Sequence, residues 1–103
     1  MIRNRPPSKQ ARTVFAVLMI QPQRWRHGYD LAKSAGLSSG TLYPLLIRLH
    51  QRGLLDARWE ESDQPGRPPR HVYRLSAKGQ RYAQGIERLS EYRQHIPASE
   101  LPA

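Results

Sequence analysis

The amino-acid sequence predicts a mainly α-helical fold with a small β-hairpin, which places the chain in the α+β class. Apolar residues recur at helical spacing in three segments of the first half, and they alternate with polar residues in two segments after Gly53. Helical spacing returns after Ser76. With 103 residues, the chain has the length of one domain.

The first predicted helix begins after Ser8 and ends before Pro22. Apolar residues between 11 and 18 are spaced three and four apart, and the Ser8 hydroxyl is suited to cap the amide groups of the first turn. Residues 1–7 contain two arginines and two consecutive prolines, which do not begin a packed helix. We therefore expect a disordered basic arm at 1–7.

The second and third predicted helices are joined by a tight turn. A short helix around Leu31 should end at Gly36, because glycine readily adopts the left-handed conformation that follows many helices. The third helix starts at Ser38 or Ser39, either of which is suited to cap it, and ends at Gly53. Its apolar face consists of Leu42, Leu45, Leu46 and Leu49.

Two β-strands are expected next, because apolar and polar residues alternate over 55–59 and again over 71–75. The segment 61–69 is rich in proline, glycine and charge, so it should form an extended loop at the tip of a hairpin.

Ser76 is expected to cap a last helix over 76–96, and 97–103 should form a disordered tail. A narrow apolar seam along this helix is typical of a helix that packs on another helix. The seam consists of Tyr82, Ile86, Leu89 and Ile96.

This order of elements is that of a winged helix-turn-helix, which we assign to residues 8–75, with 76–96 as a C-terminal dimerisation helix. In such a fold the third helix presents its N-terminal end to the major groove of double-stranded DNA. The hairpin tip, or wing, reaches the adjacent backbone or minor groove. The candidate DNA-binding residues are Ser38, Ser39, Thr41, Tyr43 and Arg48 on the helix and Arg67, Pro68 and Arg70 on the wing.

Each candidate also has a structural interpretation. Ser38 and Ser39 can serve only as helix caps and Tyr43 can pack inside the protein, although their hydroxyls are equally able to donate to phosphates or base edges. The wing arginines can enter a minor groove, where the potential is negative, or they can offset the acidic residues at 60, 61 and 63.

The charge balance favours a polyanionic partner. The chain has 17 Lys and Arg against 8 Asp and Glu, a formal net charge of +9, although a basic surface can also serve solubility alone. The lack of cysteine excludes disulfides and thiolate metal sites and fits a reducing cytoplasm. The longest apolar run, 14–20, is too short for a membrane span. No pattern typical of an enzyme, a metal site or a cofactor site is found, so none of these is expected.

The motifs resemble those of the PadR family of regulators over about residues 13–81. The similar stretches are HGYDL at 27–31, GLSSGTLYPLL at 36–46, RL at 48–49, GL at 53–54 and RLSAKG at 74–79. The resemblance implies a repressor that is a homodimer joined mainly by its last helix, binds a palindromic operator and is released by a small molecule or another signal. It also assigns the recognition role to Tyr43 with the neighbouring hydroxyls, and the wing role to Arg67 and Pro68.

Other interpretations stay open. Trp25 and Trp59 are candidates to line a pocket for a flat aromatic effector, or they belong to the core. The fold could be that of another winged-helix family, such as one resembling MarR, although those place additional helices around the DNA-binding domain. A winged helix that binds an acidic protein is a further alternative, against which the arginine-bearing wing argues. RNA binding is disfavoured because no aromatic-rich sheet is expected.

Overall fold

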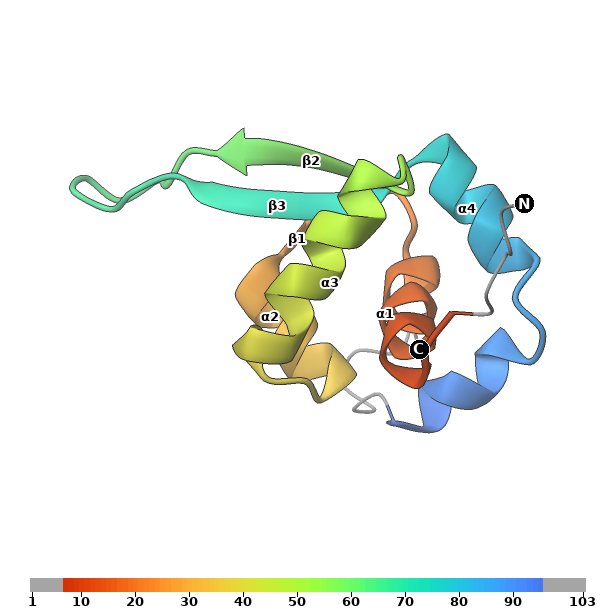
Figure 1. Cartoon of the computed structure of the whole chain (residues 1–103). Helices are drawn as coiled ribbons and strands as arrows, with labels where there is room; N and C mark the ends of the chain where they lie inside the picture. The colour runs from red at the N-terminus through yellow and green to blue at the C-terminus, as the bar shows by residue number, and fades with distance from the viewer. Residues whose placement is uncertain (1–6, 96–103) are drawn as a thin grey trace.

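The structure is a computed structural model that describes residues 7–95. The elements are α1 (Lys9–Ile20), β1 (Arg26–His27), α2 (Gly28–Ala35), α3 (Ser39–Gln51), β2 (Leu55–Glu60), β3 (Arg70–Leu75), α4 (Ala77–Gln84) and the 3-10 helix η1 (Leu89–His95). The predicted α+β class is confirmed, with helices around a small antiparallel sheet (Figure 1). All but the last residue of the predicted arm 1–7, and the predicted tail 97–103, lie outside the described residues.

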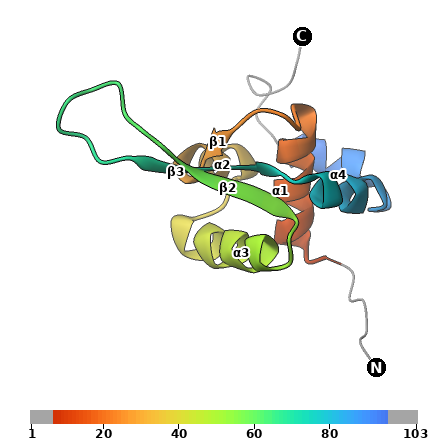
Figure 2. The same cartoon turned by 90° about the horizontal axis from the view of Figure 1, so that it is seen from above.

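Helix α1 is the centre of the core. Ser8 caps it as predicted, since its hydroxyl accepts a hydrogen bond of 3.1 Å from the backbone N–H of Ala11. Val14, Phe15 and Val17 are completely buried. Two perpendicular views place α1 between α3 and α4 (Figures 1 and 2). Burial of side chains of this size contributes about 1.5–3 kcal/mol each, so this helix is the main support of the domain.

Helices α2 and α3 form the predicted helix-turn-helix. Gly36 ends α2 in the left-handed conformation, with a φ of 67°. Ser38, rather than Ser39, caps α3, because its hydroxyl accepts a hydrogen bond from the backbone N–H of Thr41. The predicted apolar face of α3 is buried at all four leucines, Leu42, Leu45, Leu46 and Leu49.

The hairpin has the register that the alternation predicts. Strands β2 and β3 pair antiparallel, and a third strand, β1, pairs with the other edge of β3. No strand was expected at β1, because two residues are too few to show a period of alternation. The alternating residues face one another as pairs on one side of the sheet: Leu55 with Leu75, Ala57 with Tyr73, and Trp59 with His71.

A buried arginine connects β1 to α2. Arg26 is only 5% exposed. Its Nε donates to the carboxylate of Asp30, and a terminal nitrogen donates to the buried Ser34 hydroxyl at 2.8 Å. Asp30 is partly exposed, so the ion pair is only partly buried, whereas the contact with Ser34 lies inside the protein. This contact therefore holds the start of α2 against the sheet.

Close backbone packing fixes the junction between the hairpin and α4. Ser76 caps α4 by accepting from Gly79 N–H, and its hydroxyl donates to the carbonyl of Gly53 at 2.6 Å. Its backbone N–H donates to the Leu54 carbonyl at 3.1 Å. A side chain at Gly79 would overlap that same carbonyl, so only glycine fits there.

The last helix is shorter than predicted, and the expectation of one helix over 76–96 is wrong. Helix α4 ends at Gln84, and the 3-10 helix η1 follows after a turn. Gly85 is a poor helix former, at a cost of about 1 kcal/mol relative to alanine. Arg88 has a positive φ of 58°, which interrupts the helical path. The predicted seam is therefore broken, and Ile96 lies outside the described residues.

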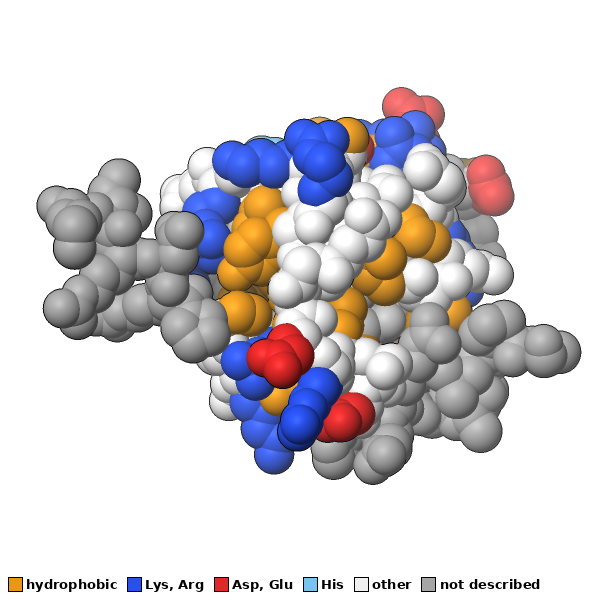
Figure 3. Space-filling view, turned by 90° about the vertical axis from the view of Figure 1, so that its right-hand side faces the viewer, with side chains coloured by type: hydrophobic (Ala, Val, Ile, Leu, Met, Phe, Trp, Pro, Cys, Tyr) orange, Lys and Arg blue, Asp and Glu red, His pale blue; other side chains and the backbone are white. Residues whose placement is uncertain are grey.

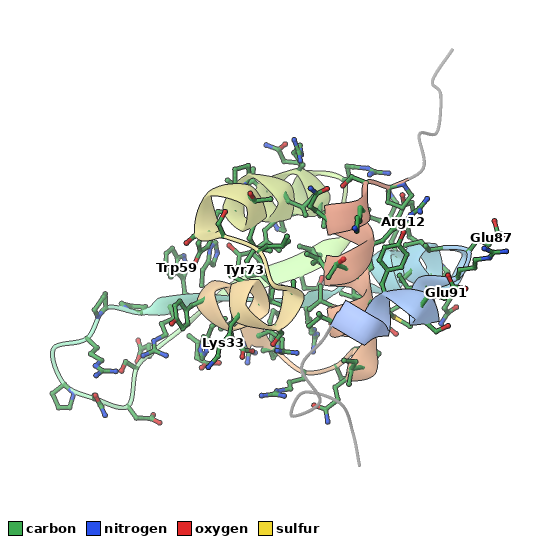
Figure 4. All side chains as sticks on the ribbon, turned by 90° about the horizontal axis from the view of Figure 1, so that it is seen from below. Arg12, Lys33, Trp59, Tyr73, Glu87 and Glu91 are labelled. Carbon is green, nitrogen blue, oxygen red and sulfur yellow. The ribbon has the colours of Figure 1, made fainter. Side chains whose placement is uncertain are left out.

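The turn after α4 brings the C-terminal segment back onto α1. Tyr82, Ile86 and Leu89 of the predicted seam pack against the core of their own chain. Arg12 of α1 donates a hydrogen bond of 3.0 Å to the Tyr92 hydroxyl of η1. Figure 4 shows Arg12 on the side of α1 where α4 and η1 lie. Apolar surface of α1 that a straight helix would leave exposed is covered in this way.

Candidate nucleic-acid interface

The hairpin loop and the first turn of α3 are directed toward the same end of the molecule. The β2–β3 hairpin extends past α2 and α3, while α4 lies at the opposite end (Figures 1 and 2). The structure leaves all eight candidate DNA-binding residues exposed: Ser38, Ser39, Thr41, Tyr43, Arg48, Arg67, Pro68 and Arg70.

The hydroxyls at the start of α3 have different partners. Ser38 accepts from the Thr41 N–H at 3.3 Å and donates to the Thr41 hydroxyl at 3.1 Å. The capping role predicted for Ser38 is confirmed, and this hydroxyl has no second proton to donate. Ser39 and Thr41 are therefore the hydroxyls better suited to donate to a phosphate. The N-terminal end of a helix also favours a nearby anion.

Tyr43 lies over the start of α2 and remains 40% exposed. A Cβ atom placed on Gly28 would lie 2.7 Å from Cε1 of the Tyr43 ring, so the ring occupies the space beside that glycine. The glycine of the HGYDL stretch and the tyrosine of the GTLYP stretch are thus in contact, which the sequence alone did not predict. Tyr43 both packs on α2 and presents part of its surface to solvent.

Tyr43 also approaches the sheet. Burial of Tyr73 on β3, together with the nearby Tyr43, raises the pKa of the Tyr73 hydroxyl above its ordinary value. The same hydroxyl lies 3.1 Å from Nδ1 of His71. Because the hydroxyl stays protonated at neutral pH, it is able to donate to that nitrogen.

The side chains of Arg48 and Tyr43 lie on different sides of α3. Arg48 borders a cavity together with Pro7 and Ser8 at the start of α1, whereas Tyr43 lies over α2. Sequence reasoning missed Ile47, which is 55% exposed on α3. Its position outside the leucine face was the available signal. An exposed apolar group on a recognition helix is suited to contact a thymine methyl group.

The wing loop presents Arg67 to solvent. A turn orders this part of the loop, since Gly66 has a φ of 84° and the Arg67 N–H donates to the Gln64 carbonyl at 3.3 Å. Glu61 and Asp63 are exposed in the same loop, but within residues 7–95 Arg67 forms no ion pair with either. The alternative in which Arg67 offsets the acidic residues therefore has no contact to support it.

Trp25 and Trp59 do not line a common pocket, so that prediction is wrong. The Cζ atoms of Arg58 and Arg74 lie 4.2 and 4.4 Å from the centroid of the Trp25 ring. Trp59 is stacked on His71 instead. Because neighbouring strand residues point to opposite faces, Arg58 with Trp25 and Trp59 with His71 belong to different faces of the sheet. The core alternative also fails for Trp59, which is 68% exposed.

Between residues 7 and 95 no group of three or more His, Cys, Asp or Glu is arranged to hold a metal ion. No helix in this range is long and apolar enough to cross a membrane.

The helix-turn-helix, the exposed first turn of α3 and the projecting hairpin together define a winged helix-turn-helix protein. The model of the transcriptional regulator PadR-like family matches residues 17–85. The chain therefore belongs to the PadR-like family of transcriptional regulators, a family of DNA-binding regulators and not of enzymes. No curated protein matches the chain.

Solved structures of regulators are similar to this fold. A PadR family transcriptional regulator from Eggerthella lenta is 33% identical, with a TM-score of 0.63 over 81% of this chain and 75% of that one. A PadR-like transcription factor from Bacteroides fragilis is 30% identical, with a TM-score of 0.60 over 84% of each chain. The PcaV regulator of Streptomyces coelicolor, solved with its natural ligand, is 27% identical, with a TM-score of 0.65 over 91% of this chain and 62% of that one.

Proposed function

We propose that this protein is a transcriptional repressor that binds a palindromic operator as a homodimer. The observation that carries the proposal is the joint exposure of the first turn of α3 and the arginine-bearing wing at one end of a chain with a net charge of +9. Phosphate contacts by such a surface supply much of the affinity of DNA-binding proteins.

Within this function the residues divide by role. Ser39, Thr41 and Tyr43 contact phosphates or base edges in the major groove, and the positive end of α3 supports them. Arg67 enters the minor groove, with Pro68 limiting the freedom of the loop. Ser38 acts mainly as the cap. Arg48 and Arg70 contact the backbone at the edges of this surface.

The dimer interface is proposed on the face formed by α1, α4 and η1. A groove of about 430 Å³ lies there, with Met19, Ile86 and Leu89 among its lining residues. Figure 3 shows hydrophobic side chains spread over this face between groups of Lys and Arg. The groove lies at the opposite end from the wing, so a second copy bound there leaves both wings accessible to DNA. The resemblance to PadR regulators, which implies a dimer joined at the C-terminal end, agrees with this position.

Ile86→Asp tests the dimer interface. It places a charge in a half-buried apolar contact, so sedimentation should show monomers, while Glu87→Gln at the exposed neighbouring position should sediment like the parent. If circular dichroism shows that Ile86→Asp has lost the fold, Met19→Lys, at another residue that lines the groove, replaces it. If both variants fold and both still sediment as dimers, the interface lies elsewhere and this part of the proposal is wrong.

We also propose that a small molecule releases the repressor from DNA. The PcaV regulator was solved with a natural ligand, which shows that one protein of similar fold binds one. In this chain the groove lined by Met19, Ile86 and Leu89 is the candidate place for an effector.

Selection of bound fragments from genomic DNA tests the function directly. A repressor of this kind should enrich fragments with paired half-sites about 34 Å apart, and its affinity should fall steeply with salt as counterions are released. RNA of equal length and an acidic polypeptide serve as competitors. Preference for either competitor, or affinity that does not respond to salt, would contradict the proposal.

A further inference from the structure

The exposed large hydrophobic side chains of the described residues all lie on the helix-turn-helix and the hairpin. They are Tyr29 on α2, Tyr43 and Ile47 on α3, and Trp59 on β2. The roles proposed above leave Trp59, which is 68% exposed, unexplained.

Trp59 is the outer end of a row of aromatic side chains whose other end lies near the recognition helix. Its ring is stacked on His71, with centroids 4.4 Å apart and planes at 11°. The His71 ring lies 5.1 Å from the ring of Tyr73, which in turn neighbours Tyr43 on α3. Figure 4 shows Trp59 beyond Tyr73, near the point where the hairpin leaves the helical body. The three rings therefore form one row along the hairpin, and Tyr43 of α3 lies near the Tyr73 end of that row.

The stacked pair offers donors and apolar surface together. The indole Nε1–H of Trp59 is a donor only. A Tyr73 hydroxyl that donates to Nδ1 of His71 leaves the imidazole proton on Nε2, the second nitrogen of that ring. Two N–H donors beside the face of an aromatic ring suit a phosphate and its deoxyribose, since the donors bind the phosphate oxygens and the ring packs against the sugar. No base edge is needed for such a contact.

We propose that Trp59 and His71 together bind the DNA backbone between the groove that α3 enters and the groove that the wing reaches. The position favours DNA over a second copy of the chain, because the hairpin projects at the end opposite to the groove between α1, α4 and η1 (Figure 1). The net charge of +9 favours the same partner. The inference rests on the proposed DNA-binding function and adds a contact that is independent of base sequence.

Tryptophan fluorescence tests the contact with a short DNA duplex of mixed sequence at low salt. The emission of Trp59 is obtained as the difference between the parent and Trp59→Phe, and it should change as the duplex saturates the protein. Trp59→Ala and His71→Ala should each weaken binding about tenfold, the usual effect of losing a hydrogen bond to a charged group. His50→Ala, which alters an exposed histidine near the C-terminal end of α3, should bind within twofold of the parent.

The results separate this inference from the function on which it rests. If the parent does not bind the duplex at all, the proposed function fails. If the parent binds but the Trp59 emission is constant and Trp59→Ala binds like the parent, only the stacked-pair contact is refuted. The contact is also refuted if Trp59→Ala turns dimers into monomers, or if a small aromatic acid changes the emission and the duplex does not.

Discussion

The substitution Gly28→Ala tests the contact between α2 and the recognition helix. The added Cβ would lie 2.7 Å from both Cε1 and the hydroxyl oxygen of Tyr43, far inside the optimum of about 3.5–4.0 Å between non-bonded carbon atoms. If the ring stays in place, overpacking lowers the free energy of unfolding by about 1–3 kcal/mol. In a domain of this size, each kcal/mol lost from the free energy of unfolding lowers the melting temperature by about 4–8 °C. If the ring moves away instead, stability is kept but DNA affinity falls.

A double-mutant cycle with Tyr43→Ala distinguishes this steric effect from a general loss of helix stability. Without the ring, Gly28→Ala should cost at least about 1 kcal/mol less in urea unfolding than it does in the parent, the size of coupling seen between residues in contact. Gly40→Ala is the matched control, because nothing lies within 4 Å of a Cβ at that exposed position of α3. Equal costs of Gly28→Ala in both backgrounds, together with unchanged DNA affinity of the Gly28→Ala protein, would refute the reasoning.

Three further substitutions test separate parts of the structure. Gly79→Ala should destabilise the fold by at least about 3 kcal/mol in urea unfolding, because the new side chain meets a backbone carbonyl that cannot move aside; unfolding like the parent would contradict this close approach. Arg67→Ala should weaken operator binding by about 1–3 kcal/mol without changing the melting temperature. Arg81→Ala, which removes an exposed arginine from α4, should have little effect on binding. Equal losses of affinity in both variants would indicate a general effect of charge. The pKa of the Tyr73 hydroxyl is raised in the native state, so the folded protein holds this proton more tightly than the unfolded chain does. The protonated hydroxyl therefore contributes fully to stability below the unfolded-state pKa of about 10. This contribution is lost as the pH rises through the native-state pKa. Tyr73→Phe should therefore lessen the alkaline loss of stability, and an unchanged alkaline profile would rule out this linkage.

The sequence predicted the elements whose signals are local and repeated. Ser8, Ser38 and Ser76 cap helices where the sequence placed caps, and the alternation over 55–59 and 71–75 gave the correct hairpin face. Strand β1 was missed because pairing with β3, and not its own two residues, makes it a strand. The buried Arg26 was missed for the same reason, since its partners depend on that pairing.

The error at the C-terminal helix has a different physical origin. The apolar positions at 82, 86 and 89 fit a continuous helix, and the same positions also fit a chain that turns after Gly85 and packs on α1. Periodicity cannot distinguish these arrangements, because both bury the same side chains. The contact between Arg12 and Tyr92 favours the second, and it joins residues 80 positions apart, a separation at which a sequence pattern carries no signal.

The contacts around Tyr43 suggest how the DNA-binding surface keeps its shape. Its ring rests on Gly28 of α2 and lies near Tyr73 of β3, so the preceding helix supports the recognition helix. A surface fixed in this way loses less conformational entropy on binding than separate mobile parts would. The groove proposed as the dimer interface, by contrast, is formed partly by a segment that follows Gly85 and Arg88. In the proposed dimer, a ligand or partner that shifts this segment would alter the spacing of the two recognition helices without deforming either one. Binding to a palindromic operator depends on that spacing, so its affinity would change.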